Sequence, residues 1–310
     1  MVNVALLLAN LGLALVVAPL LNGLIKSSKA GWQNRQGPGI LQPWFDLWKY
    51  LSRESVVSQH ASWLFRWAPY LYFAAHLAAA GLVPTLAVLS PLSGMGDVIL
   101  LVGLLALARF ALAVAALDTA SNFGAMGTSR ELAFAAMVEP ALLISLFALA
   151  IPAGSTELGA MVGEGQLSVA RLLALAALFI VAIAETGRIP VDNPDTHLEL
   201  TMAHEGMLLE YSGRPLGLLL WATHIKQFVI LSLVAALFFP WGMARDLGGL
   251  SLAVGGAVYL MKLAALGSAL ALVESANVKL RIFRVPELLG AASLLGLLAV
   301  TSIYLVGGST

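Results

Sequence analysis

Eight apolar segments, each about as long as a lipid bilayer is thick, dominate this sequence and restrict its fold. They are residues 2–25, 69–92, 98–117, 132–151, 169–184, 216–239, 250–273 and 288–306. A helix needs roughly 20 apolar residues to cross a membrane. Only 11% of the residues are charged, whereas a soluble domain carries about 25%. The sequence therefore predicts an all-α, polytopic integral membrane protein with about eight transmembrane helices in one membrane domain, residues 1–310.

Lysine and arginine are distributed unevenly over the connections between these segments. The connections after the first, third, fifth and seventh segments hold Lys26, Lys29, Arg35, Lys49, Arg53, Arg66, Arg130, Arg188, Arg214, Lys279, Arg281 and Arg284. The opposite side holds Arg245 and, at the start of the fifth segment, Arg171. The positive-inside rule places the basic connections in the cytoplasm and both termini outside. The formal net charge is zero, so nucleic acid is not an expected partner.

Several motifs for cofactors or metals are missing or incomplete. The chain has no cysteine, which excludes thiolate-held iron–sulfur clusters and disulfides. HEGML at residues 204–208 begins like a zinc-protease motif but lacks the second histidine. His197 with His204, or His76 with His224, are weak candidates for a metal and a haem, respectively. We expect no metal site on this chain, and any redox centres to lie on other chains.

The first connection contains an amphipathic helix. In ILQPWFDLWKYLSRE, residues 40–54, apolar side chains recur at helical spacing; they are Leu41, Trp44, Phe45, Trp48 and Leu51. Asp46, Lys49 and Arg53 fall on other faces. Tryptophan at headgroup depth is typical of a helix lying on the membrane surface. Two interpretations remain open: a membrane anchor, or the wall of a cavity or docking surface.

Residues 184–213 collect an unusual share of the 17 acidic residues of the chain. They are Glu185, Asp192, Asp195, Glu199, Glu205 and Glu210, joined by the phenol of Tyr211. Ionisable groups near hydrocarbon are expensive, so such clustering indicates ion movement or a charged partner. Asn193 and Pro194 resemble the start of a helix, which would place Asp195 and Glu199 on one face.

Charged residues also occur inside the apolar segments. Glu139, Glu185, Lys226 and Lys262 lie in or at the ends of the fourth to seventh segments, and Arg109 lies in the third. A central charge costs about 2.5–3.5 kcal/mol on insertion scales, so these groups must face protein or water. Structural ion pairs and a proton or ion relay are both possible, and we favour the relay. Glu139 should lie near water and near Glu185 or, failing that, Lys226. The arginines should fix nearby carboxylates.

Several motifs together resemble a known family. AExxRxPxDxPxxxxEL at residues 184–200, EYSG at 210–213 and NRxGPGxLQ at 34–42 resemble the membrane subunit that forms the heel of respiratory complex I, also called its subunit 1. Ser121, Asn122, Gly127, Arg130 and Glu139 are similar to that family's third connection and fourth span. The resemblance covers most of the chain.

Departures from complex I favour one branch of this family. His197 and Lys226 stand where complex I has acids, and LEYSG is similar to the membrane subunit of group 4 membrane-bound [NiFe]-hydrogenases. These include the formate hydrogenlyase and hydrogenase-4 complexes. The resemblance implies a non-redox subunit of a prokaryotic inner membrane. It would bind the hydrogenase large and small subunits, antiporter-like subunits and lipid, with Ni-Fe and iron–sulfur centres on partners and no cofactor on this chain.

The resemblance also implies two groups of functional residues. An ion path would contain Glu139, Glu185, Lys226, Lys262, Asp118, Arg130 and Glu131. A cytoplasmic cavity and docking region would contain Arg35, Asp46, Arg188, Asp192, Asp195, His197, Glu199, Glu205, Glu210 and Tyr211. The alternatives are the quinone-site subunit of a true complex I, a scaffold-only anchor and a freestanding transporter. The inverted repeats and broken spans of many transporters are not evident here.

Overall fold

The computed structural model describes residues 2–58, 61–88, 92, 94, 96–162, 168–192, 203–244 and 248–307. Over these residues the secondary structure is almost entirely helical. The helices are α1 (Val2–Trp32), α2 (Gln42–Leu51), α3 (Trp63–Leu82), α4 (Val98–Asp118), α5 (Asn122–Ala153), α6 (Leu158–Val162), α7 (Val169–Glu185), α8 (His204–Leu208), α9 (Gly213–Phe238), α10 (Gly249–Ala276), the 3-10 helix η1 (Ile282–Arg284) and α11 (Val285–Gly307).

Each of the eight predicted apolar segments corresponds to a helix, which confirms the all-α membrane fold. In the described parts of the chain, six helices are long and apolar enough to cross a membrane: α1, α4, α5, α9, α10 and the η1–α11 unit. α7 has 17 residues, which is near the lower limit for a span. α3 was predicted at 69–92 but begins at Trp63 and ends at Leu82. The side chain of Ser62 caps its start, and Val83, which precedes a proline, is extended.

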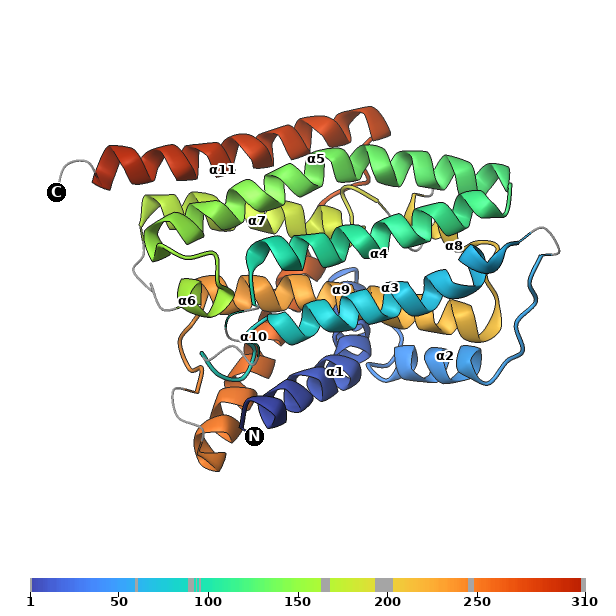
Figure 1. The fold of residues 1–310 in the computed structure, drawn as a ribbon, viewed down its shortest axis with the longest axis horizontal. Coiled ribbons are helices and arrows are strands. Elements are labelled where there is room, and N and C mark those ends of the chain that lie inside the picture. The colour runs from blue at the N-terminus through green and yellow to red at the C-terminus, as the bar shows by residue number, and fades with distance from the viewer. Residues whose placement is uncertain are drawn as a thin grey trace.

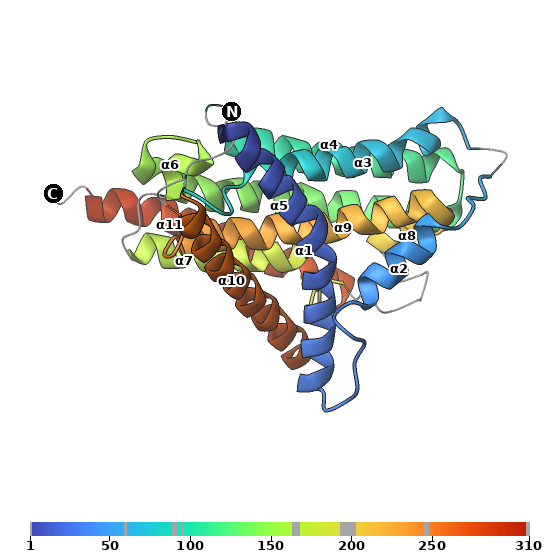
Figure 2. The same cartoon turned by 90° about the horizontal axis from the view of Figure 1, so that it is seen from below.

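The long helices form one bundle with two oblique members. α3, α4, α5, α7, α9 and α11 run side by side, as Figure 1 shows. α1 and α10 cross them at an angle and converge away from the rest of the bundle (Figure 2). α2 and α8 lie at one end of the bundle, whereas α6 and the C-terminus lie at the other (Figure 1). The first connection, which carries α2, and the described part of the connection between α7 and α9 that carries α8 therefore share one end.

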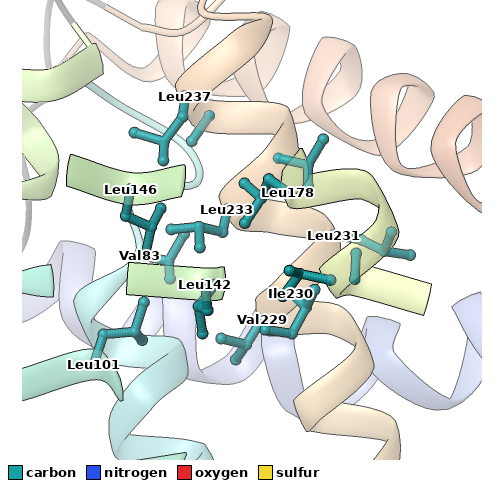
Figure 3. Close-up of a cluster of buried hydrophobic side chains, with 14 of the residues drawn as sticks. Val83, Leu101, Leu142, Leu146, Leu178, Val229, Ile230, Leu231, Leu233 and Leu237 are labelled. Atoms are coloured by element: carbon teal, nitrogen blue, oxygen red, sulfur yellow. The ribbon is translucent and has the colours of Figure 1, made fainter. Parts of the chain in front are cut away.

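α9 forms the centre of the core. Its residues from Ile225 to Leu237 are all buried, as expected for a helix surrounded by other helices. Leu142 and Leu146 of α5, Leu178 of α7 and Leu233 of α9 meet in this core (Figure 3). Because α9 is enclosed, any charged side chain on it must find a partner inside the protein.

The predicted amphipathic helix is confirmed as α2, but its apolar residues divide between two faces. Leu47 is buried, and Trp44 packs edge-on against Trp221 with ring centroids 5.6 Å apart. Phe45 and Trp48 instead point away from the protein and are 65% and 76% exposed. One face therefore holds α2 on the bundle, while the other presents aromatic rings suited to headgroup depth.

Candidate functional site

A buried arginine in the middle of α4 joins carboxylates from two other helices. Arg109 Nη2 donates to Glu185 Oε1 at 2.6 Å, and Nη1 donates to Glu139. Its Nε lies 3.7 Å from Glu131 Oε1, and Lys226 Nζ lies 2.8 Å from Glu185 Oε2. We call these five residues the Arg109 cluster. It unites four of the seven residues predicted for an ion path.

The helices explain why these side chains meet. Glu131, Ala135 and Glu139 follow one another at four-residue spacing on α5, so both carboxylates lie along one ridge. Glu185 is the last residue of α7, where the helix dipole disfavours a negative charge. Glu185 is also almost fully buried. Two cations, one from α4 and one from α9, are therefore needed to keep it ionised there.

One expectation about Glu139 needs correction. Glu139 was expected beside Glu185 or Lys226, but its ion-pair partner is Arg109, which bridges Glu139 to Glu185. The arginines were expected to fix nearby carboxylates, and Arg109 does so with two of them. The cluster holds three carboxylates and two cations, so one carboxylate can accept a proton while both cations remain paired. The Glu139 side chain, 33% exposed, is the least buried of the three.

Three cavities with shared wall residues lie at or near the Arg109 cluster. The largest, about 380 Å³, has Phe134, Val191, Asp192 and Ala203 in its wall. The same four residues line a second cavity of about 70 Å³, which also reaches all members of the Arg109 cluster except Glu139. A third cavity of about 10 Å³ shares Arg109, Glu131, His204 and Lys226 with the second. The first two have ample room for water, and the third holds about one molecule.

The mouth of this series of cavities is rich in basic side chains. Arg130, Lys279 and Arg281 line the largest cavity together with Asp192. Lys279 Nζ binds Asp192 Oδ1 at 2.7 Å, which ties the acidic connection to the segment before α11. Arg130 was predicted for the ion path, but the structure places it at this mouth rather than in the Arg109 cluster.

α8 reaches the second cavity because two glycines allow it to approach α5 closely. A Cβ atom on Gly127 would lie 2.8 Å from the carbonyl oxygen of Ala203, and Gly206 packs on the Gly127 backbone. This contact places His204 and Glu205 in the cavity wall. Burial lowers the pKa of His204, so its imidazole is neutral near pH 7.

A second polar cluster lies on a different side of α9 and was not predicted as a unit. Arg188 donates to Glu274 at 3.3 Å, to Asn22 at 2.6 Å and to Gln227 at 3.1 Å. Lys29 lies 3.1 Å from the other oxygen of Glu274. We call these five residues the Arg188 cluster. It joins α1, α9 and α10, and Lys226 and Gln227 are adjacent residues of α9 that contact different clusters.

Two further residues predicted for the ion path lie elsewhere. Lys262 Nζ donates to the carbonyl oxygen of Phe239 at 2.6 Å and lies 4.8 Å from the Trp241 ring centroid. It therefore satisfies the C-terminal end of α9, where carbonyl groups lack helical partners. Asp118, at the end of α4, accepts a hydrogen bond from the Ser62 backbone at 2.7 Å.

The residues predicted for the cavity and docking region are dispersed. Arg35, Asp46 and Glu210 are exposed and line none of the three cavities. Tyr211 is buried, stacks on Phe65 at 3.9 Å and donates to its carbonyl oxygen. Burial, with a smaller effect of Asp118, raises the pKa of Tyr211.

The helix expected from Pro194, with Asp195, His197 and Glu199, lies outside the described residues. Within the described residues, no group of three or more histidine or acidic side chains converges to hold a metal ion.

Comparison with known proteins identifies related sequences. The profile of the family described as NADH dehydrogenase matches residues 4–306. Formate hydrogenlyase subunit 4 of Escherichia coli (strain K12) is 37% identical over 93% of this chain and 94% of its own length. Hydrogenase-4 component C of the same organism is 39% identical over 77% of this chain and 76% of its own length. NADH-quinone oxidoreductase subunit 8 of Rhodothermus marinus is 28% identical over 66% of this chain and 62% of its own length.

A solved structure shares the fold. A chain of the membrane-bound sulfane sulfur reductase, an archaeal respiratory membrane complex, matches with a TM-score of 0.84 at 21% identity. The match covers 97% of this chain and 99% of that chain. The predicted resemblance to the hydrogenase branch, with the complex I subunit more distant, is confirmed by the sequence relatives.

Proposed function

This chain belongs to the NADH dehydrogenase family, and we propose that it is the membrane subunit of a hydrogenase-type respiratory complex. In this role it binds the soluble hydrogenase subunits and provides part of an ion path. The similarity to formate hydrogenlyase subunit 4 over nearly the whole chain supports the assignment to this branch. The chain itself would carry no redox centre, because the Ni-Fe and iron–sulfur centres would reside on its partners.

The Arg109 cluster is the observation that supports an ion path. Burial favours the neutral form of a carboxylate and a nearby cation favours the ionised form, so a carboxylate that has both and that water can reach is able to exchange protons. Here three carboxylates share two cations beside a water-sized cavity. An anchor needs no such arrangement, because apolar packing of the kind found around α9 holds a bundle together without the cost of burying charge.

The exposure of Glu139 supports a partner in the membrane. Its side chain is 33% exposed in the isolated chain, although it belongs to a helix apolar enough to span the bilayer. A carboxylate facing lipid is costly, so another protein surface or a hydrated path should cover it. An antiporter-like subunit packed against α5 would supply that cover and continue the path.

The basic end of the bundle supports docking of soluble subunits. Arg281 and Arg284 lie in the connection between α10 and α11, where Val278 and Phe283 are 82% and 88% exposed. Exposed apolar side chains next to charges are typical of protein interfaces. With this end in the cytoplasm, as the positive-inside rule predicts, a cysteine at Ser58 stays protected from an impermeant thiol reagent. One at Ser155, near the other end, reacts from outside.

Purification and reconstitution test the proposal. The complex would be solubilised gently, its subunits identified by mass spectrometry, and its turnover in proteoliposomes followed together with ion uptake. We expect a large subunit with four cysteine ligands for nickel, and turnover that generates an ion gradient. Quinone-reducing partners would instead support the complex I alternative. Turnover without a gradient, in sealed vesicles that hold an imposed gradient, would favour the scaffold alternative.

A further inference from the structure

The smallest cavity contains an unsatisfied hydrogen-bond donor. This space of about 10 Å³ lies among α3, α4, α5, α8 and α9, with Tyr72, His76, Arg109, His204 and Lys226 in its wall. Arg109 is 93% buried, since its exposed fraction is 7%, and its Nε–H has no hydrogen-bond partner. The nearest carboxylate oxygen, on Glu131, is 3.7 Å away, which is too far for a direct hydrogen bond. Such buried donors are usually satisfied by ordered water.

The hydrogen bonds of His76 assign its tautomer. His76 Nδ1 lies 2.8 Å from the carbonyl oxygen of Tyr72. A carbonyl oxygen only accepts hydrogen bonds, so Nδ1 must carry the hydrogen. In the neutral imidazole, Nε2 then holds a lone pair that requires a donor. The structure records no partner for Nε2 among the described residues, although His76 is almost completely buried.

The same reasoning assigns the tautomer of His204. Its Nε2 lies 3.3 Å from Thr223 Oγ1, and this hydroxyl donates its only hydrogen to the Leu219 carbonyl oxygen at 2.9 Å. Because the contact with the Leu219 carbonyl oxygen is the shorter of the two, we assign the hydroxyl hydrogen to it and assign His204 Nε2 as the donor toward Thr223. Its Nδ1 is then an acceptor, as Nε2 is in His76.

We propose that this cavity holds one ordered water molecule, which donates to His76 Nε2 and His204 Nδ1 and accepts from Arg109 Nε. A water molecule has two hydrogens to donate and can accept, so it matches two acceptors and one donor. The volume of the cavity corresponds to about one water. The water site itself is independent of the proposed function.

Together, the two histidines and the water form a side arm of the ion path, and this part rests on the proposed function. His204 lines both this cavity and the larger cavity beside it. When a proton from the larger cavity binds to His204 Nδ1, the water turns its oxygen toward this nitrogen, and Nδ1–H donates the proton to the water oxygen. The water simultaneously releases another of its protons to His76 Nε2. One O–H bond forms as another breaks, so the water is unchanged and the positive charge moves to His76.

The surroundings of the arm make protonated histidine short-lived. Arg109 and Lys226 face the same cavity and disfavour a further positive charge, whereas Glu131 favours it. Burial lowers the pKa of His204. A group that binds the proton weakly also releases it readily, so the proton exchanges between the two histidines and the larger cavity.

High-resolution cryo-electron microscopy of the whole complex tests the water. We expect a single density between the two imidazoles and Arg109 in the wild type. The density should persist in His76→Gln, whose side chain can still accept a hydrogen bond, and should be lost in His76→Leu. An empty cavity in a map that resolves other buried waters would overturn the water site.

Ion translocation by the reconstituted complex tests the arm. Glutamine does not titrate near neutral pH, so His76→Gln should slow proton transfer through this arm by roughly a hundredfold, the lower end for a positioned proton carrier. His224→Gln is the matched control, because His224 is a partly buried histidine that contacts Asn22 on another side of α9. Unchanged translocation in an assembled His76→Gln complex would overturn the arm but leave the water. Absence of translocation in the wild type would refute the proposed function, whereas the water would be judged from the map alone.

Discussion

Replacing Arg109 by glutamine should destabilise the protein more than any other single change in the cluster. The substitution removes the cation shared by three carboxylates. Breaking a buried ion pair by removing one partner costs about 3–5 kcal/mol. Glu185 keeps Lys226 at 2.8 Å, and Glu139 is partly exposed. We therefore expect a loss near the lower limit, about 3 kcal/mol in the free energy of unfolding.

A double-mutant cycle separates the ion pair from general disruption. Glu139→Gln alone should cost about 1.5 kcal/mol, because a hydrogen bond between charged groups is lost. In the absence of Arg109, the same change should cost almost nothing, since it then removes an unpaired charge. The expected interaction energy is thus about 1.5 kcal/mol, within the usual range for contacting residues.

The assay is reversible unfolding in mixed micelles, followed by tryptophan fluorescence, of the wild type, the two single variants and the double variant. Lys262→Gln serves as the control, because Lys262 contacts Phe239 and Trp241 and shares no recorded partner with Arg109. Its combination with Arg109→Gln should be additive to within about 0.5 kcal/mol. An interaction energy near zero for Arg109 and Glu139 would refute the bridging role of the arginine.

Three other substitutions give distinct expectations. Gly127→Val should displace α8, which would appear as faster proteolysis between α7 and α9. Gly103→Val is the control, because a Cβ atom there has nothing within 4 Å. Equal proteolysis rates in the two variants would contradict the close approach of α8 to α5. Because folded His204 has a lowered pKa, it contributes stability above the unfolded pKa of about 6.5 that is lost as pH falls below it. His204→Gln should therefore flatten the decline in thermal stability below that pH, and an unchanged slope would contradict this. Asp192→Asn, which removes the charge from the 2.7 Å ion pair with Lys279, should reduce turnover of a complex that still assembles; normal turnover would argue against a role for this carboxylate.

The sequence was sufficient to predict the long helices and most of the Arg109 cluster. Long apolar segments have few structural alternatives in a membrane, and buried charges must face one another or water. Glu139, Glu185 and Lys226 could therefore be expected to lie close together from their positions in the apolar segments. The pairing geometry could not be predicted, because which charge bridges the others depends on helix rotation and on the length of the arginine side chain.

Lys262 and Glu274 show what sequence reasoning could not supply. Lys262 is buried like Lys226, but its partner is a backbone carbonyl at the end of α9 rather than a carboxylate. The free carbonyl groups at the C-terminal end of a helix can bind a cation, as a carboxylate can. The sequence does not show which of these two partners a buried lysine has. Glu274 was missed because the seventh apolar segment ends at residue 273, whereas α10 continues to Ala276 and buries this carboxylate.

Ion translocation per turnover in Glu139→Gln proteoliposomes tests the central claim most directly. The glutamine keeps the size of the side chain but cannot exchange a proton, and Arg109 retains Glu185. Glu287→Gln, an exposed change in the first turn of α11, is the control. We predict that Glu139→Gln assembles, turns over soluble donors and fails to build a gradient, while the control behaves as wild type. An undiminished gradient in Glu139→Gln would show that the ions move through partner subunits alone.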